Sequence, residues 1–218
     1  VYMSEDYGKS WNPINSNLPF SPVNVIIEDN VNKDILYVGN DHGVYISLNK
    51  GKFWEPFTKG LNSASVHDLV IQKEMNHLLV GTHGRSIYLA ELENIQKLNS
   101  EILNQDLYVY DIKDIKRSNS WGTKWGTWGD YVTPNMDIVI FSKNKIDYRI
   151  SIKSNDGKLV HINDGVLDKG LNYIDYNLRY NNNDLKKSVD NSDYLAKGSY
   201  KLLLTVNNNS IEKEFKIK

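Results

Sequence analysis

The sequence predicts an all-β protein: the last blades of a β-propeller, a short helical connector and an immunoglobulin-like β-sandwich. Three observations predict this fold class. A segment repeats, because the run that begins at Val1 returns at Val44, an offset of 43 residues. Apolar and polar residues alternate in short runs, and turns rich in Gly and Asn separate those runs. A repeat period in the low forties that is built of short strands is typical of a propeller blade.

The repeat defines where the blades are expected. Its two copies are Val1-Tyr2-Met3-Ser4-x-Asp6-x-Gly8-x-x-Trp11 and Val44-Tyr45-Ile46-Ser47-x-Asn49-x-Gly51-x-x-Trp54. Alternation predicts one complete blade with strands at 23–28, 35–39, 44–48 and 53–58. The outer half of a preceding blade would then occupy 1–15, and the inner three strands of a following blade would occupy 66–92.

These blades are too few to form a closed propeller. Propellers contain about four to eight blades, and an open fragment leaves long strand edges exposed. The sequence is therefore expected to be the C-terminal part of a longer protein. The rest of the propeller would come from an upstream part of the same protein or from another chain.

The pattern changes after residue 92, which gives three expected regions. The incomplete propeller is 1–92, a connector with a short helix and a Trp/Gly-rich loop is 93–134, and the sandwich is 135–218. Ser100 is a candidate N-cap in the connector. Sandwich strands are expected near 136–142, 147–154, 158–162, 171–179, 199–206 and 211–217. The residues expected to point inward are Tyr148, Ile150, Ile152, Leu202, Leu204, Phe215 and Ile217.

Composition excludes several classes of function. The net charge is −1, with 26 basic and 27 acidic residues and no block of one sign, so no nucleic-acid or anionic-membrane surface is predicted. The absence of Cys excludes disulfides and thiolate metal sites. No apolar run is long enough to predict a transmembrane segment. No cofactor motif is present, and none is expected.

The repeated motif resembles the Asp-box, also called the bacterial neuraminidase repeat. This motif is shared by sialidases, xyloglucanase-type glycosidases and sortilin-like propellers. The run "VGTHGRSIYLAEL" is similar to the last blade of bacterial Asp-box proteins that carry an immunoglobulin-like C-terminal domain. The resemblance implies a secreted, periplasmic or cell-surface protein. The C-terminal "KGSY…KEFKIK" also resembles the sorting domains of the type IX secretion system.

The acidic residue of the motif is expected to be structural. Asn49 replaces Asp6 in the second copy, which keeps an acceptor oxygen and loses the charge. A turn tolerates that change, whereas a catalytic carboxylate does not. Gly8 would supply a positive φ, and Trp11 would pack into the blade. The structural set is Ser4, Asp6, Gly8, Trp11, Ser47, Asn49, Gly51 and Trp54.

Candidate ligand-binding residues lie in the turns between second and third strands, on the propeller face opposite the Asp-boxes. They are His42, His83, Arg85, Asp41 and Thr82. Arg85 could hold a carboxylate or sulfate, and the two histidines could bind polar ligands. Alternatively, His-Gly is a turn element and Arg85 pairs with a neighbouring blade. No third ligand has a spacing that predicts a metal site.

The connector loop "WGTKWGTWGDYVTP" contains Trp121, Trp125 and Trp128. Indoles between glycines can form a platform on which a sugar stacks. They can equally fill the joint between propeller and sandwich, and this interpretation is favoured.

These observations predict a non-catalytic scaffold with a surface that binds a protein or a glycan. One alternative is a fragment of a glycoside hydrolase whose catalytic residues lie mostly upstream, because no carboxylate pair can be assigned within the sequence. Another is that the sandwich acts as a secretion or surface-anchoring domain.

Overall fold

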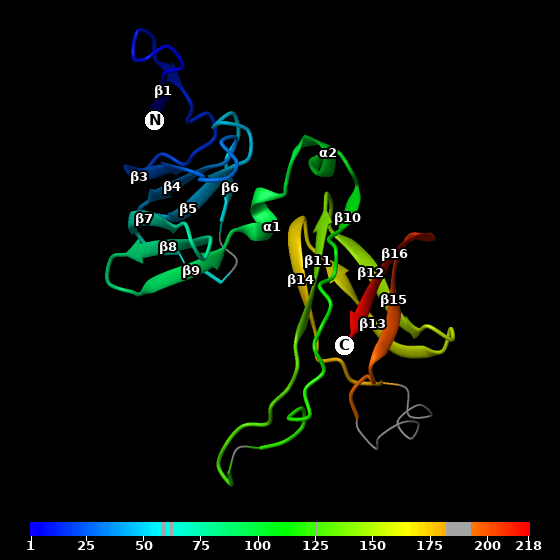
Figure 1. Ribbon diagram of the computed structural model, residues 1–218. Coiled ribbons are helices and arrows are strands. Elements are labelled where there is room, and N and C mark those ends of the chain that lie inside the picture. The colour runs from blue at the N-terminus through cyan, green and yellow to red at the C-terminus, as the bar shows by residue number, and fades with distance from the viewer. Residues whose placement is uncertain (58–59, 62, 125, 182–192) are drawn as a thin grey trace. The chain divides into compact units, whose positions relative to one another are not determined.

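The computed structural model describes residues 1–57, 60–61, 63–124, 126–181 and 193–218 (Figure 1). The protein is all-β, and the two helices within the described residues have four residues each, α1 (Glu93–Gln96) and α2 (Ser100–Leu103). Ser100 is the first residue of α2 rather than the residue before it, a difference of one position. The chain forms two compact units, Val1–Glu101 and Ile102–Lys218. Within the described residues, no helix combines the length and apolar character needed to cross a membrane.

The N-terminal unit contains a hairpin and two antiparallel sheets. Strands β1 (Tyr2–Met3) and β2 (Asn12–Pro13) form the hairpin. The four-stranded sheet has the order β3-β4-β5-β6, and the three-stranded sheet has the order β7-β8-β9 (Figure 1). Their bounds are β3 (Val23–Glu28), β4 (Leu36–Asn40), β5 (Gly43–Ser47), β6 (Glu55–Pro56), β7 (Val66–Gln72), β8 (His77–Thr82) and β9 (Ile87–Glu91).

The expected blade strands are present, and the fourth is shorter than expected. The sequence predicts a strand at 53–58, but β6 contains only Glu55 and Pro56. Pro56 has no N–H to donate to the ladder, so pairing with β5 cannot continue regularly through it. The next residue, Phe57, still donates its N–H to the carbonyl oxygen of Val44 at 2.8 Å.

Strand β4 lies at the centre of the N-terminal unit, and all five of its residues are buried. One face carries Leu36 and Val38, which pack with Ile14 and Trp54 in an apolar cluster bordered by the β1–β2 hairpin. On the other face, Gly39 lies against Val66 of β7. The four-stranded sheet is therefore covered on both faces, by the hairpin on one and by the three-stranded sheet on the other.

A buried carboxylate joins α1 to the four-stranded sheet. Asp29 is 2% exposed, and Tyr37 donates its hydroxyl to Asp29 Oδ2 at 3.0 Å. Gln96 of α1 donates its side-chain amide to both carboxylate oxygens at 3.0 Å. Burial, and then the charge of Asp29, raise the pKa of Tyr37. Each oxygen of Asp29 thus has partners, which is what a buried charge requires.

The C-terminal unit is an immunoglobulin-like sandwich. One sheet has the order β10-β11-β14 and the other β13-β12-β15-β16, and their inner faces share one core. All seven residues predicted to point inward do so; Tyr148 is partly buried against that core and the other six are buried in it. The bounds are β10 (Leu107–Val109), β11 (Met136–Ser142), β12 (Ile146–Ser154), β13 (Leu159–Leu167), β14 (Gly170–Tyr176), β15 (Gly198–Val206) and β16 (Asn209–Ile217).

Candidate functional site

The first Asp-box loop uses its carboxylate within the loop. The backbone N–H of Ser10 donates to Asp6 Oδ1 at 2.8 Å, and the Ser10 hydroxyl donates to Oδ2 at 2.7 Å. Ser4 donates its hydroxyl to Asp6 Oδ1 at 2.9 Å and accepts the N–H of Gly8 at 2.7 Å. These bonds favour the charged carboxylate, so they lower the pKa of Asp6, with the Ser10 hydroxyl as the largest cause.

The second loop repeats this pattern with an amide in place of the carboxylate. Ser47 donates its hydroxyl to Asn49 Oδ1 at 3.0 Å and accepts the N–H of Gly51 at 2.8 Å. The N–H of Phe53 donates to Asn49 Oδ1 at 2.9 Å. Both glycines have a positive φ, +84° at Gly8 and +78° at Gly51. The two loops therefore have the same local geometry, with or without a charge.

The two tryptophans of the repeat do not have equivalent surroundings. Trp54 is 1% exposed and donates its indole N–H to the carbonyl oxygen of Ile14 at 2.6 Å. Trp11 was expected to pack into its blade, but this prediction is wrong, because Trp11 is 60% exposed. Ile14, which follows the β1–β2 hairpin, packs against Trp54.

Asp41 lies in the turn between β4 and β5 and connects the two sheets. Its Oδ1 accepts the Ser65 hydroxyl at 2.8 Å and the Asn24 amide at 3.0 Å. Those bonds, the Ser65 bond first, lower the pKa of Asp41. Asn24 also donates to the carbonyl oxygen of Val66 at 3.0 Å. Asp41 and Asn24 thus hold the beginning of β7 against the four-stranded sheet, and we refer to this pair as the clasp.

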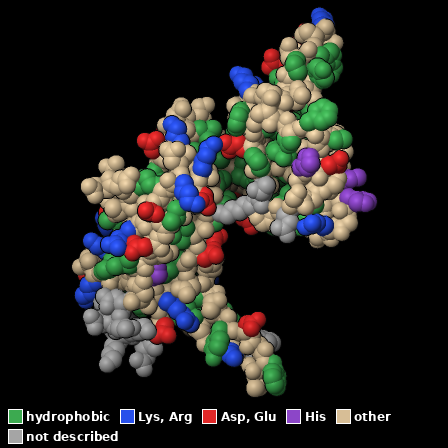
Figure 2. Space-filling model, turned by 180° about the vertical axis from the view of Figure 1, so that it is seen from behind, with side chains coloured by type: hydrophobic (Ala, Val, Ile, Leu, Met, Phe, Trp, Pro, Cys, Tyr) green, Lys and Arg blue, Asp and Glu red, His purple; other side chains and the backbone are tan. Residues whose placement is uncertain are grey.

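The corresponding turn of the three-stranded sheet contains the other three candidates. Thr82 exchanges hydrogen bonds with the backbone of Ser86, which closes the loop between β8 and β9. The His83 ring stacks on that of His67, with centroids 5.3 Å apart and planes 28° apart. Arg85 is exposed, and no described residue forms an ion pair or hydrogen bond with it. Figure 2 shows histidine side chains beside an acidic one on the surface of the N-terminal unit.

The strand register shows that the two His-Gly pairs are not equivalent. Asn40 pairs with Gly43, so only Asp41 and His42 lie between β4 and β5. The loop after Thr82 contains four residues, because β9 begins at Ile87. His83 is the first residue after β8, as Asp41 is the first after β4, so His83 corresponds to Asp41 and not to His42.

His67 is the residue that the sequence patterns missed. It lies in β7, outside the turns in which candidates were sought. The repeat offset could have found it, because 24 plus 43 is 67 and His67 therefore corresponds to Asn24 of the clasp. Among the described residues, no three His, Asp or Glu side chains are grouped in a way that could hold a metal ion.

The Trp/Gly loop forms an arm whose indoles lie in different surroundings. The N–H of Gly122 donates to Val132 and the N–H of Val132 to Thr123, at 2.8 and 2.9 Å, so the base of the arm is a short hairpin. Trp121 is half-buried, with its ring 5.8 Å from Tyr194 and with Arg117 4.8 Å above it. The Trp128 side chain is 98% exposed. Trp125 lies outside the described residues.

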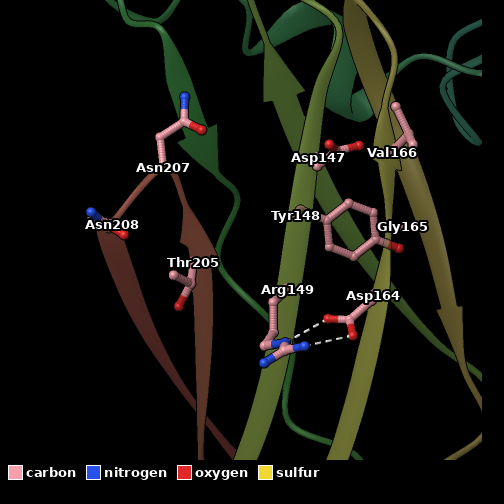
Figure 3. Close-up of a pocket in the computed structure, with 9 residues that line it drawn as sticks. All are labelled: Asp147, Tyr148, Arg149, Asp164, Gly165, Val166, Thr205, Asn207 and Asn208. Atoms are coloured by element: carbon pink, nitrogen blue, oxygen red, sulfur yellow. Dashed lines mark hydrogen bonds and ion pairs between the residues drawn. The ribbon is translucent and has the colours of Figure 1, made fainter.

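A shallow depression of about 650 Å³ lies on the sandwich, and none of the ligand-binding candidates predicted from the sequence lines it (Figure 3). Its floor contains the Arg149–Asp164 pair, in which two guanidinium N–H groups donate to the two carboxylate oxygens at 2.7 and 2.9 Å. The Tyr148 ring lies directly over Gly165. Arg149 and Asp164 are thus already paired with each other.

Comparisons with known proteins show no family for this chain. No family profile matches the sequence, and no curated protein matches it. Similar solved structures include PorZ, a surface component of the type-IX secretion system of Porphyromonas gingivalis (14% identity, TM-score 0.32, 91% of this chain and 23% of that chain). Another is the extracellular domain of BT4673 from B. thetaiotaomicron (12% identity, TM-score 0.27, 91% of this chain and 25% of that chain). A third is a Listeria innocua β-glucosidase (10% identity, TM-score 0.25, 50% of this chain and 15% of that chain). The chain spans a quarter or less of the length of these structures.

Proposed function

We propose that the N-terminal unit is part of a non-catalytic Asp-box scaffold, extracytoplasmic in location. The edge formed by its β4–β5 and β8–β9 turns, which we call the clasp edge, binds a protein or an acidic glycan. The observation that carries the scaffold role is the shared pattern of the two loops. Asp6 and Asn49 accept the same kinds of hydrogen bond from their own loops. A position that works equally with a carboxylate and an amide serves the turn and not proton transfer.

Two further carboxylates of this unit, Asp29 and Asp41, support the same proposal. Glycoside hydrolysis uses two carboxyl groups about 5 to 10 Å apart, one on each side of the scissile bond. Asp29 is buried and accepts from Tyr37 and Gln96, and Asp41 accepts from Ser65 and Asn24. These groups are committed to the fold. Neither Asp29 nor Asp41 is therefore free to act as one member of such a pair.

The cationic side chain at the clasp edge supports binding of an anion. Arg85 is exposed and without a partner among the described residues, and its planar guanidinium matches a carboxylate or sulfate with two parallel hydrogen bonds. The exposed His42 and His83 lie in the two turns of the same edge and offer further donors. A sialylated or sulfated oligosaccharide has the chemistry that this edge can recognise.

Calorimetry with a sialylated or sulfated oligosaccharide tests this proposal. Arg85→Ala is expected to weaken binding by about tenfold, the loss of one charge-assisted contact. Arg149→Ala is the matched control, because that arginine is already paired with Asp164 on the sandwich. Equal affinity for neutral and acidic oligosaccharides would contradict the proposal. Hydrolysis of aryl glycosides by the chain, abolished by Asp41→Asn, would favour the enzyme alternative instead.

A further inference from the structure

The two sheets of the N-terminal unit have the same strand register. Gly39 of β4 lies opposite Val44 of β5, and Gly81 of β8 lies opposite Ile87 of β9. The first strand of each sheet, β3 or β7, contains a bulge directly before the residue that pairs with this glycine. Side chains at matching places in the two sheets can therefore be compared.

The bulge residue of each sheet reaches the first residue after the second strand. In β3 the residue without a partner in the ladder is Asn24, which donates to Asp41 Oδ1 at 3.0 Å. In β7 it is His67, whose ring stacks on that of His83 with centroids 5.3 Å apart. A bulge leaves one residue unpaired and redirects its side chain. The same backbone geometry thus brings two side chains together in both sheets, with different chemistry.

The pair in the four-stranded sheet is a hydrogen-bonded part of the fold. Asp41 accepts from Ser65 and Asn24, and Asn24 also donates to the carbonyl oxygen of Val66. The bond from Ser65, and then the bond from Asn24, lower the pKa of Asp41 because they favour its charged form. An amide does not titrate in this range. This pair therefore keeps one negative charge wherever histidine changes its own charge.

The pair in the three-stranded sheet is exposed, and its rings are available to a ligand. No described residue forms a hydrogen bond or ion pair with the imidazole of His67 or His83. The backbone N–H of His83 donates to the carbonyl oxygen of Ser65 at 2.8 Å, which fixes the loop beside β7. Histidine ordinarily gains its proton between pH 5 and 8. Two imidazoles change from neutral to cationic over a range in which an amide and a carboxylate together stay anionic.

Other charged groups belong to the same edge. After its hydrogen bonds, the charges of His67 and His42 lower the pKa of Asp41 further, so all three groups are close enough to interact. Asp68 follows His67 in β7, and its Oδ1 accepts a backbone N–H of its own strand. Arg85 is exposed in the β8–β9 loop and has no partner among the described residues. Protons on the histidines would thus add to the positive charge of an existing guanidinium.

We propose that the stacked pair of His67 and His83 is a proton-activated anion site, so that acidic glycans bind the clasp edge more tightly as the pH falls. Two protonated rings at this separation repel each other, which opposes the second proton in the free chain. A sulfate or carboxylate beside the rings offsets that repulsion and accepts hydrogen bonds from the imidazolium N–H groups. The inference rests on the proposed function and adds His67 to the residues that contact the ligand.

Calorimetry with a carrageenan oligosaccharide tests the coupling, because sulfate esters are its only charged groups and they stay ionised. The affinity at about pH 5.5 is expected to be at least about tenfold higher than at about pH 7.5, the factor for one obligatory proton on a group of ordinary pKa about 6.5. Titrations near pH 6.5 in two buffers of different ionisation enthalpy measure the protons taken up. At least about half a proton per bound ligand is expected.

Variants of exposed or partly exposed histidines locate the coupling. His67→Asn gives β7 the residue that β3 has at the matching place, and it is expected to reduce the pH effect to less than about twofold. His83→Asn should do the same. His77→Asn is the matched control, because His77 is the first residue of β8 and His83 directly follows the last. The full pH effect should persist in this control.

The outcomes separate the inference from the function on which it rests. Equal affinity at both pH values would overturn the inference and leave the proposed function standing. Loss of the pH effect in His42→Asn, with its retention in His67→Asn, would assign the proton to a single turn histidine and overturn the inference as well. Arg85→Ala is expected to weaken binding by a similar factor at both pH values. No binding at either pH would contradict the proposed function and the inference together.

Discussion

The two Asp-box loops have the same hydrogen bonds but different packing. In each loop, a serine hydroxyl accepts the N–H of a glycine. In each, an oxygen of Asp6 or Asn49 accepts the backbone N–H of the residue four positions later in the sequence. Around the second loop, Trp54 is buried and Ile14 lies against Gly51. Around the first loop, Trp11 is largely exposed, and a Cβ placed on Gly8 would meet only the Trp11 ring, at 3.9 Å.

This difference separates what the motif determines by itself from what depends on residues outside it. Seven residues are sufficient to set the turn, because its donors and acceptors all lie within the motif. The packing of Trp54 also depends on Ile14, which lies next to the β1–β2 hairpin and outside the second motif. Burial of a large aromatic side chain contributes several kcal/mol, whereas a solvent-exposed turn hydrogen bond contributes about 1 kcal/mol or less. The two loops should therefore respond very differently to the same substitution.

Replacing the tryptophan is expected to give the largest difference in stability loss between the two loops. Trp54→Ala should lower the free energy of unfolding of the N-terminal unit by about 3–5 kcal/mol, because it removes a buried indole and leaves a cavity. Trp11→Ala should change it by less than about 1 kcal/mol. Hydrogen exchange of the β4 and β5 amides measures both. Equal losses would show that Trp11 is as well packed as Trp54 in solution.

Replacing the glycine should give the next largest difference. Gly8→Ala and Gly51→Ala both force a side chain into a left-handed conformation, at a cost of about 1–2 kcal/mol each. At Gly51 the new Cβ would also lie 2.8 Å from Ile14 Cβ, which adds about 1–3 kcal/mol of overpacking. The same exchange measurement should rank Gly51→Ala as the more damaging change. In an Ile14→Ala background, which removes the clash, Gly51→Ala should cost about as much stability as Gly8→Ala. If Gly51→Ala still costs more stability in that background, this explanation is contradicted.

Much of the fold could be predicted because its signals are local. Strand β3 has the predicted bounds 23–28, and the inward residues of the sandwich follow from alternation alone. Strand β13 was expected to end at 162 and continues to Leu167. Asn163-Asp164-Gly165 has the composition of a turn, but Arg149 pairs with Asp164 and the Tyr148 ring covers Gly165. These cross-strand partners, which local composition does not show, keep the segment extended.

The candidate site was less predictable because it depends on register. Asp41 and His83 were both singled out from turns, but their equivalence requires the strand pairings that end at Asn40 and Thr82. His67 lies within a strand and meets His83 only through the pairing of β7 with β8. The exposure of Ile87 and Leu89 also has no local signal, since their counterparts Val44 and Ile46 have similar chemistry and are buried.

Substitutions at the Asp or Asn position of the motif are expected to change the free energy of unfolding by a smaller amount. Asn49→Ala removes the acceptor for Ser47 and Phe53 and should cost about 1 kcal/mol. Asn49→Asp keeps that acceptor and should be close to neutral at pH 7, as the first loop carries Asp6 at this position. Chemical denaturation of the N-terminal unit measures both variants. A large loss with Asn49→Asp would show that the second loop, unlike the first, excludes a charge.

Acidification should give the smallest effect, confined to the first loop. The hydrogen bonds from Ser10 lower the folded-state pKa of Asp6 below its usual value of 3.8. A carboxylate with a lowered pKa contributes stability that is fully present above the unfolded-state pKa and is lost as the pH falls through the folded-state pKa. The amide proton of Ser10 should therefore lose its protection, and exchange at close to its intrinsic rate, only below about pH 4. The amide proton of Phe53, whose acceptor Asn49 does not titrate, is the internal control. Asp6→Asn should remove the pH dependence at Ser10, since it converts the first loop into the chemistry of the second. Loss of protection at both amides over the same pH range would instead indicate unfolding of the whole unit.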